Sequence, residues 1–428
     1  MAGVEQAELS TAARARAVLA GSLGNLVEWY DFYVYAFTAL YFSAAFFPAG
    51  DRTAQLLGTS GIFAVGFLMR PLGGWYFGRL ADRRGRRHAM QVAIAIMGAG
   101  SALIAALPTH AAIGAAAPVL LLIGRMIQGF STGGEYGTAA TYLSEIAAKG
   151  RRGFWASFQY VTLIGGQLLA LTVILLLTQV LSDAEMREWG WRVPFALGAL
   201  AAVAVLRLRR LMPETAGETT EEAGTLAALL PHWRAFVIVL GLTAGGSLFF
   251  YVFTTYMQKY LVLTAGMAPK TANWVMTAVL IPFALMQPLF GALSDRWGRK
   301  ANIVAFGIGA TLATVPLLTL LSGVQSAGAA FALVLTALTI ASIYTSVSGI
   351  FKAELFPVHV RALGVGLSYG IGNALFGGTA EYVALRFKQA GVESGFYWYA
   401  TAICAVALIT ALLMPDTRRS DPLRDTAV

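Results

Sequence analysis

The chain has 428 residues, of which 57% are hydrophobic and 12% charged, whereas about a quarter of the residues in soluble domains are charged. This composition excludes a soluble globular protein. The net charge of +9 comes from short basic clusters between apolar runs, so we expect a lipid bilayer and no nucleic acid as its partner. The apolar runs of about twenty residues predict membrane helices, because the strands of a membrane barrel are about ten residues long and alternate in polarity.

Apolar runs bounded by charge, proline or glycine predict twelve spans. In chain order they cover 18–46, 56–80, 89–107, 118–146, 154–181 and 192–212, then 235–263, 270–293, 302–321, 328–355, 362–387 and 395–414. The segments between and around them predict an N-terminal tail (1–17), a first bundle (18–212), a polar linker (213–234), a second bundle (235–414) and a C-terminal tail (415–428). We therefore predict an all-α integral membrane protein of two pseudo-symmetric six-helix bundles.

Lysine and arginine sort the predicted loops into two sides. Most of them, including Lys149, Arg207, Arg209 and Arg210, fall on one side, which by the positive-inside rule is cytoplasmic together with both termini. The lone Cys404 excludes an intrachain disulfide. The histidines all lie in loops or at helix ends, so we expect no metal site. We also expect a monomer without a cofactor.

A charged hairpin occurs twice, at 78–87 and 291–300. Glu145 to Arg152 recurs as Glu354 to Arg361 at nearly the same offset, which indicates a duplicated half. Duplicated transporter folds hold their substrate between the halves. The arginines of the hairpins can also be plain positive-inside anchors, but that reading does not explain a carboxylate at both positions. We predict that the hairpins are conformational-switch motifs, carried by Gly78, Asp82, Gly85 and Arg86 and by Gly291, Asp295, Gly298 and Arg299.

Charged residues inside the apolar runs are costly and usually functional. On two predicted helices such charges belong to a stripe of polar residues at helical spacing, formed by Ser22, Asn25, Glu28, Asp31 and Tyr35 and by Arg125, Gln128, Thr132 and Glu135. The helix directions place Asp31 near mid-membrane, with Arg125 toward the outer side. A carboxylate that faces an arginine can exchange that partner for a proton. Asp31 is thus the predicted proton-coupling residue, with Glu28 and Glu135 as alternatives, although a permanent ion pair between the helices is also compatible with the pattern.

Arg70 is a third charge at mid-membrane depth. Because Pro71 follows it, Arg70 can either contact substrate or bond to carbonyls that the proline frees. The second half contributes Tyr251, Tyr344 and Asn373 at suitable depths. Lys259 and Lys352 lie near helix ends, so we expect their side chains to reach the interface rather than the substrate.

The hairpins and Arg125-x-x-Gln128-Gly129 resemble the signature motifs of the major facilitator superfamily. Within it, Gly24–Phe32, Phe67–Gly74 and Gly133–Gly137 resemble the metabolite:proton symporters. Four more stretches resemble members that carry 2-oxoglutarate: Phe154–Gln167, Arg187–Arg192, Phe253–Tyr260 and Lys352–Pro357. The resemblance implies a twelve-helix importer of 2-oxoglutarate or a similar dicarboxylate in a bacterial inner membrane, driven by inward proton flow. Arg84 and Trp297 depart from the hairpin pattern.

A dicarboxylate needs cationic partners in a dehydrated cavity, and Arg70 and Arg125 are the deepest ones. Our working hypothesis is that Arg125 shuttles between Asp31 and the substrate while Arg70 holds the other carboxylate. The predicted substrate-binding set comprises Arg70, Arg125, Tyr35, Gln128, Tyr160, Gln167, Tyr251, Tyr344 and Asn373.

Alternative substrates are citrate, shikimate and betaine or proline, although a betaine would favour an aromatic cage. A proton/drug antiporter would require unpaired acidic residues for cationic drugs. An enzyme or sensor is disfavoured, since we find no metal-ligand pattern, nucleophile elbow or phosphate-binding loop in the sequence.

Overall fold

The computed structural model describes residues 11–47, 52–147, 150–210, 214 and 223–416. These residues form twelve long helical spans, several of them broken into two helices. The first six spans are α1 (Thr11–Phe46), α2 and α3 (Arg52–Leu68, Arg70–Arg84), α4 (Arg86–Ala106), α6 (Ala116–Ile146), α7 and α8 (Arg152–Ala156, Phe158–Val180) and α10 (Arg192–Arg209). The second six are α12 and α13 (Trp233–Tyr251, Met257–Leu263), α14 (Pro269–Trp297), α15 (Arg299–Ser322), α16 and α17 (Ala327–Thr345, Ser348–Glu354), α18 and α19 (Arg361–Gly372, Ala380–Gln389) and α20 (Glu393–Leu413).

The spans lie close to the predicted ranges, with small differences at the segment edges. The helix α1 begins at Thr11 rather than at 18, and α12 begins at Trp233 rather than at 235. Within the predicted linker, the short helix α11 (Leu226–Leu229) precedes α12. Residues 1–10, 213, 215–222 and 417–428 of the predicted tails and linker lie outside the described residues.

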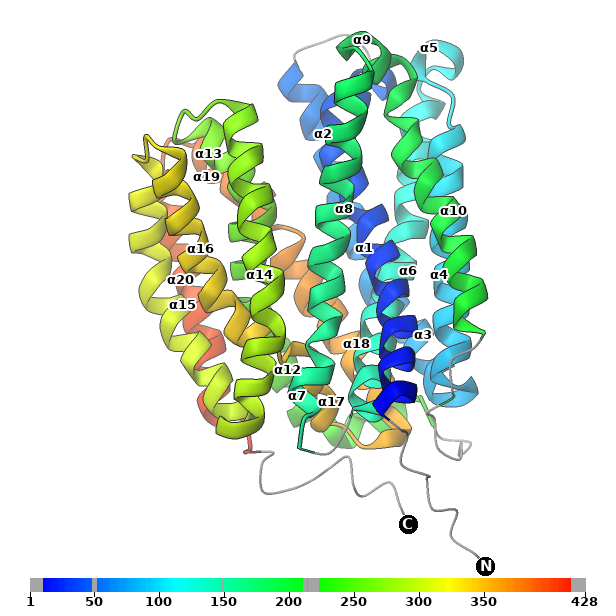
Figure 1. Ribbon diagram of the computed structural model, residues 1–428, viewed down its shortest axis with the longest axis vertical. Coiled ribbons are helices and arrows are strands. Elements are labelled where there is room, and N and C mark those ends of the chain that lie inside the picture. The colour runs from blue at the N-terminus through cyan, green and yellow to red at the C-terminus, as the bar shows by residue number, and fades with distance from the viewer. Residues whose placement is uncertain (1–10, 48–51, 148–149, 211–213, 215–222, 417–428) are drawn as a thin grey trace, which may run out of the picture.

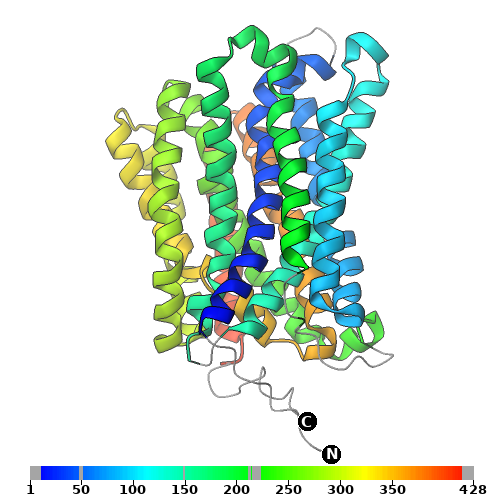
Figure 2. The ribbon, with the colours of Figure 1, turned by 45° about the vertical axis from the view of Figure 1, so that its right-hand side comes forward.

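The helices form two groups that correspond to the two halves of the sequence. In Figure 1 the helices α14, α15, α16 and α20 of the second half stand to the left of the blue-to-green helices of the first half, whereas the orange α18 passes behind the first half; in the turned view of Figure 2 orange segments again lie behind blue and green helices. We call the end of the molecule that carries the two charged hairpins the hairpin end. The predicted all-α fold of two six-helix bundles is confirmed.

Apolarity is uneven among the spans. Seven of the described helices are long and apolar enough to cross a membrane, or eight if the bent pair Asp183–Gly190 and Arg192–Arg209 counts as one span. The other spans are α1, α2 with α3, α6, and α18 with α19, and several of the buried charged side chains lie on them, among them Asp31, Arg70 and Arg125. Helices that carry polar groups within a membrane must turn them toward protein or water. The polar residues therefore lie inside the protein, where a site can form.

The two bundles interlock at the hairpin end through a pair of equivalent aspartates. Asp82 at the end of α3 accepts hydrogen bonds from the backbone N–H groups of Ala362 and Leu363 in the first turn of α18, at 3.2 and 2.9 Å. Asp295 does the same for Gly153 and Phe154 in α7, at 2.8 and 3.1 Å. A carboxylate at a helix N-terminus is stabilised by the helix dipole, so each half of the repeat caps a helix of the other half.

Arginines and glutamates extend this contact. Arg86 pairs with Asp82 at 2.7 Å and with Glu145 at 3.2 Å, and Arg361 of the other bundle also reaches Glu145, at 3.1 Å. In the second copy Arg299 pairs with Asp295 at 2.9 Å. Residues of both bundles thus share one charged network at the hairpin end.

Glycine is required at this end for two different reasons. Gly85 and Gly298 have φ angles of 98° and 97°, which other residues rarely adopt. A Cβ on Gly78 would lie 2.6 Å from the Cα of Leu363, and one on Gly291 would lie 2.5 Å from the carbonyl oxygen of Gly153. The bundles can therefore close at the hairpin end only because these two positions lack side chains.

Candidate substrate and proton sites

Arg70 crosses from the first bundle to the second at the break between α2 and α3. Its guanidinium group lies over the rings of Phe67 and Phe32, at 4.0 and 4.5 Å, and donates to the hydroxyl of Tyr251 at 3.3 Å. Among the described residues the Arg70 side chain forms no hydrogen bond to a backbone carbonyl, so the alternative that it binds carbonyls freed by Pro71 is not met in this structure. Its Nε and Nη2 atoms have no hydrogen-bond partner among the described residues.

Predicted residues of the second bundle gather around this point. Tyr251 ends α12, where one turn of π-helix follows (Val252–Tyr256), and Asn373 begins an equivalent π turn after α18 (Asn373–Gly377). Such turns often mark functional sites. The amide oxygen of Asn373 and the hydroxyl of Tyr344 are buried without a hydrogen-bond partner among the described residues. The predicted second-bundle residues therefore offer unused polar atoms deep in the protein.

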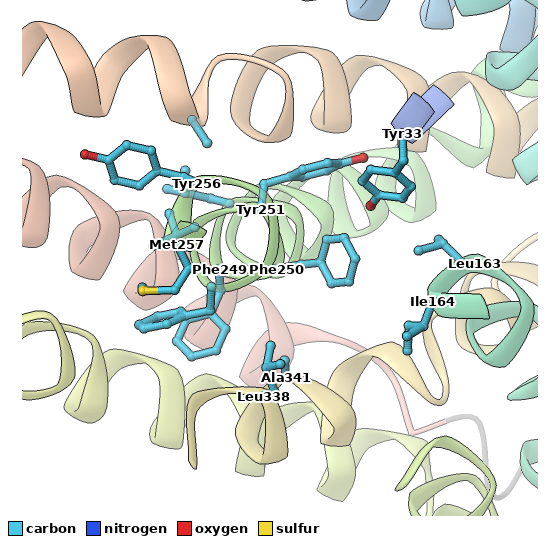
Figure 3. Packing of buried hydrophobic residues seen from close by; sticks show 14 of the residues in the cluster. Tyr33, Leu163, Ile164, Phe249, Phe250, Tyr251, Tyr256, Met257, Leu338 and Ala341 are labelled. Atoms are coloured by element: carbon cyan, nitrogen blue, oxygen red, sulfur yellow. The ribbon is translucent and has the colours of Figure 1, made fainter. Parts of the chain in front are cut away.

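Tyr160 and Gln167 lie one above the other on α8. Tyr160 lies close enough to Tyr251 and Arg70 to interact with them electrostatically. The side-chain oxygen of Gln167 is buried without a hydrogen-bond partner in the described part of the chain. Figure 3 shows Tyr251 pointing toward Tyr33 of α1, and Phe250 pointing toward Ile164 of α8. Aromatic rings of both bundles thus meet where the Arg70 guanidinium lies.

Arg125 lies inside the first bundle with the residues predicted beside it. Its Nη1 donates to Gln128 at 2.7 Å, and its guanidinium group lies 4.2 Å from the ring of Tyr35 and 5.1 Å from that of Phe32. Phe32 therefore contacts both arginines. The Nε and Nη2 atoms of Arg125 are buried without a hydrogen-bond partner among the described residues.

Asp31 is completely buried near Arg125, with which it interacts electrostatically. The two groups form no ion pair within 4 Å, so the permanent ion pair considered from the sequence is not present in this structure. The carboxylate packs against α10, where a Cβ on Gly198 would lie 1.7 Å from its Oδ1. Asp31 thus faces the interior of the first bundle rather than the contact between bundles.

Glu135 lies deeper and has a partner that the sequence analysis missed. Arg209 was assigned to the basic loop side, but the structure places its side chain fully inside the bundle, where it pairs with Glu135 and donates to the carbonyl of Met90. A Cβ on Gly24 would overlap this guanidinium group. The sequence did contain a signal for this pair. A carboxylate in an apolar run, such as that of Glu135, requires a cation nearby, and Arg209 is that cation. The neighbouring Glu28 accepts a hydrogen bond from Ser131 at 3.0 Å.

Of the two lysines that we expected to reach the membrane interface, one does and one does not. Lys259 is 40% exposed and pairs with Glu381. Lys352, in contrast, is completely buried, and the expectation that it reaches the interface is wrong. Its ammonium group donates to the hydroxyls of Tyr136 and Ser348, at 2.9 and 2.8 Å.

The site therefore contains the buried cations Arg70, Arg125 and Lys352, and in the described part of the chain none of them has a carboxylate within 4 Å. An uncompensated charge in a low-dielectric interior is expensive. Such groups are retained where an anionic ligand or a moving proton compensates them. Among the described residues, no cluster of three or more His, Cys, Asp and Glu side chains could hold a metal ion.

Comparison with known families places this arrangement in a class of transport proteins. The family model described as "Sugar (and other) transporter" matches residues 17–228, and the model "Major Facilitator Superfamily" matches residues 239–427. The chain belongs to the major facilitator superfamily, whose members are multi-pass membrane transporters.

Particular relatives are similar over nearly the whole chain. The "Alpha-ketoglutarate permease" of Escherichia coli strain K12 is 57% identical over 94% of both chains. The "Citrate-proton symporter" of Klebsiella pneumoniae is 33% identical over 92% of this chain and 90% of its own, and the "Proline/betaine transporter" of Salmonella typhimurium strain LT2 is 31% identical over 94% and 83%. Among solved structures, the proton:xylose symporter XylE with bound 6-bromo-6-deoxy-D-glucose has a TM-score of 0.77 at 18% identity, over 97% of this chain and 98% of that one.

Proposed function

We propose that the protein is a proton-coupled symporter that imports 2-oxoglutarate or a similar dicarboxylate across a bacterial inner membrane. The observation that carries the proposal is the guanidinium group of Arg70, which lies between the bundles with two nitrogen atoms unpaired. A forked guanidinium is well suited to a carboxylate. The choice among dicarboxylates is supported by the 57% identity to a protein named alpha-ketoglutarate permease.

In the proposed mechanism Arg70 holds one carboxylate group, and Arg125 alternates between Asp31 and the substrate. Protonation of Asp31 removes the negative charge that attracts Arg125, so the arginine becomes available to the dianion. The electrostatic contact between Asp31 and Arg125, without a close ion pair, supports this exchange. Glu135 is a weaker alternative because its own arginine favours its ionised form, and Glu28 is the second alternative.

We further propose that the hairpin end and both termini face the cytoplasm, because the basic loops lie there. The interlock of Asp82 and Asp295 with the opposite bundle closes this end. The described conformation is then closed to the cytoplasm, and transport requires that the interlock opens while the far end closes. The protein acts as a monomer, and the proton is its coupling ion.

Substrates of the other relatives are the alternatives within the same class. A betaine would use an aromatic cage for its quaternary ammonium group. The rings of Trp29, Phe32 and Phe67 are already covered by the guanidinium group of Arg70, and a second cation would be repelled there. Citrate carries carboxylates that the same arginines can bind, so experiment must distinguish citrate from 2-oxoglutarate as the substrate.

The test is uptake of labelled 2-oxoglutarate by proteoliposomes with an imposed pH gradient, with citrate and shikimate as competitors. We expect accumulation that collapses when a protonophore removes the gradient. Asp31→Asn and Arg125→Lys should both lose gradient-driven accumulation. Wild-type accumulation in either variant removes that residue from the mechanism, and accumulation of another acid instead of 2-oxoglutarate overturns the substrate assignment.

A further inference from the structure

Lys352 is the buried cation that the proposed mechanism does not use. It lies two residues before the end of α17, next to the charged network of the hairpin end, yet its side chain does not extend toward that end. Side chains on a helix lean toward its N-terminus, and Lys352 donates to Ser348 one turn earlier on the same helix. Because α16 and α17 run toward the hairpin end, the ammonium group is displaced toward the middle of the membrane.

The ammonium group lies where the two bundles meet. Its other hydrogen bond goes to the hydroxyl of Tyr136 in α6 of the first bundle, at 2.9 Å. The ring of Tyr136 stacks on that of Tyr369 in α18, with centroids 3.4 Å apart, and the ammonium nitrogen is 4.8 and 4.4 Å from the two centroids. Aromatic faces and hydroxyl groups ease the burial of a cation, but they do not neutralise its charge.

A purely structural role accounts poorly for this residue. Two neutral hydroxyl groups are all that the ammonium group bonds to in the described part of the chain, and no carboxylate lies within 4 Å of it. A buried cation without an anion is generally less favourable than an apolar side chain of the same size. Packing alone would therefore favour methionine or leucine at this position.

The same tyrosines connect Lys352 to Arg70. Tyr369, which lies under the ammonium group, is also an electrostatic neighbour of Arg70. Tyr160 lies near Arg70 and Tyr251 and also near Ser348 and Tyr136. A series of neighbouring tyrosine side chains thus connects Arg70 of the first bundle with Lys352 of the second.

We propose that Lys352 binds the distal carboxylate of the substrate, while Arg70 holds the 2-oxo acid end together with Arg125. This inference rests on the proposed function and assigns it a specificity residue in the second bundle. A dianion that bridges Arg70 and Lys352 compensates a buried charge on each bundle. A monocarboxylate leaves Lys352 uncompensated, so the site should prefer diacids.

The test compares the binding of two acids of equal chain length to the purified protein in nanodiscs by calorimetry. One is 2-oxoglutarate, and the other is 2-oxopentanoate, which has a methyl group in place of the distal carboxylate. In the wild type we expect 2-oxoglutarate to bind at least about 30-fold more tightly, the usual effect of a buried charge partner. Lys352→Met should lose that preference by weakening only 2-oxoglutarate, and Lys352→Arg should keep part of it.

Lys259→Met is the matched control, since Lys259 is a lysine of the same bundle with its own partner Glu381. This variant should prefer 2-oxoglutarate over 2-oxopentanoate as strongly as the wild type does. If Lys352→Met does not reach the membrane, Lys352→Gln replaces it. The inference is overturned if the variant keeps the preference, or if both acids weaken equally. A wild type that binds neither acid would instead refute the proposed function.

Discussion

Gly291→Ala should open the hairpin end of the protein. Gly291 of α14 faces α7 and α8 of the first bundle, and a Cβ there would lie 2.5 Å from the carbonyl oxygen of Gly153 and 2.9 Å from the Cβ of Ser157. Side-chain carbons essentially never approach other atoms closer than 3.0 Å. Since one of these contacts is to backbone, no rotamer change can relieve it, and the two bundles must separate locally.

The size of the shift toward the open state follows from the hydrogen bond between Gly153 and Asp295, which lies beside the new contact. Restoring an ordinary contact requires a shift of roughly 1 Å, which stretches the 2.8 Å bond between Gly153 N–H and Asp295 beyond hydrogen-bonding distance. A hydrogen bond to a charged group contributes about 1.5 to 3 kcal/mol. The equilibrium between closed and open hairpin ends should therefore move about 10- to 150-fold toward the open state.

Cysteine labelling measures this shift. Ala140 of α6 is buried against Ala353 and Phe356 of the other bundle, so a cysteine placed there reacts only when the end opens. With the buried Cys404, the chain's one cysteine, replaced by serine, the maleimide reaction rate of Ala140→Cys should rise by the same factor in Gly291→Ala.

Two control substitutions separate opening from general damage. Gly61→Ala adds a Cβ that meets no atom within 4 Å, and should leave the rate unchanged. Gly307→Ala places a Cβ 2.9 Å from the Cα of Leu408 within one bundle, and should lower thermal stability without a specific rise in labelling. A folded Gly291→Ala protein that labels at the rate of Gly61→Ala would show that the added methyl group does not separate the bundles.

Two further substitutions probe buried charges. Arg209→Met leaves Glu135 buried without its partner and should destabilise the protein by about 3 to 5 kcal/mol in thermal unfolding, whereas adding Glu135→Gln should recover most of the loss. Gly198→Ala places a Cβ 1.7 Å from the carboxylate of Asp31 and should impair proton-driven uptake more than binding; unchanged uptake would show that Asp31 can move freely.

Most of the fold could be predicted because membrane burial imposes strong local rules. Runs of about twenty apolar residues leave few alternatives to spanning helices, and the twelve predicted ranges match the observed spans closely. Helix ends were less certain, and α1 begins earlier than predicted because the amphipathic residues from Thr11 onward continue the same helix. Breaks such as the π turn at Val252–Tyr256 have no comparable sequence signal, because they arise from packing between helices.

Individual charges were harder to place. The sequence identified Arg70 and Asp31 as buried, since each interrupts an apolar run. It did not identify the depth of Arg209 and Lys352, because a cation near a helix end can either extend to the interface or turn inward. Which of the two occurs depends on whether another helix supplies a partner, as α6 does with Glu135 for one and Tyr136 for the other.

The spans, the duplicated halves and the candidate residues for binding a dicarboxylate and a proton could be predicted from the sequence, because they follow from hydropathy, spacing and the cost of charge in lipid. The packing of the helices, in contrast, decides which charges meet. It separated Asp31 from the contact between bundles, paired Arg209 with Glu135, and left the ammonium group of Lys352 facing Tyr136. A charged side chain in a membrane takes its partner from whichever helix lies beside it. The local sequence around that charge does not specify which helix this is.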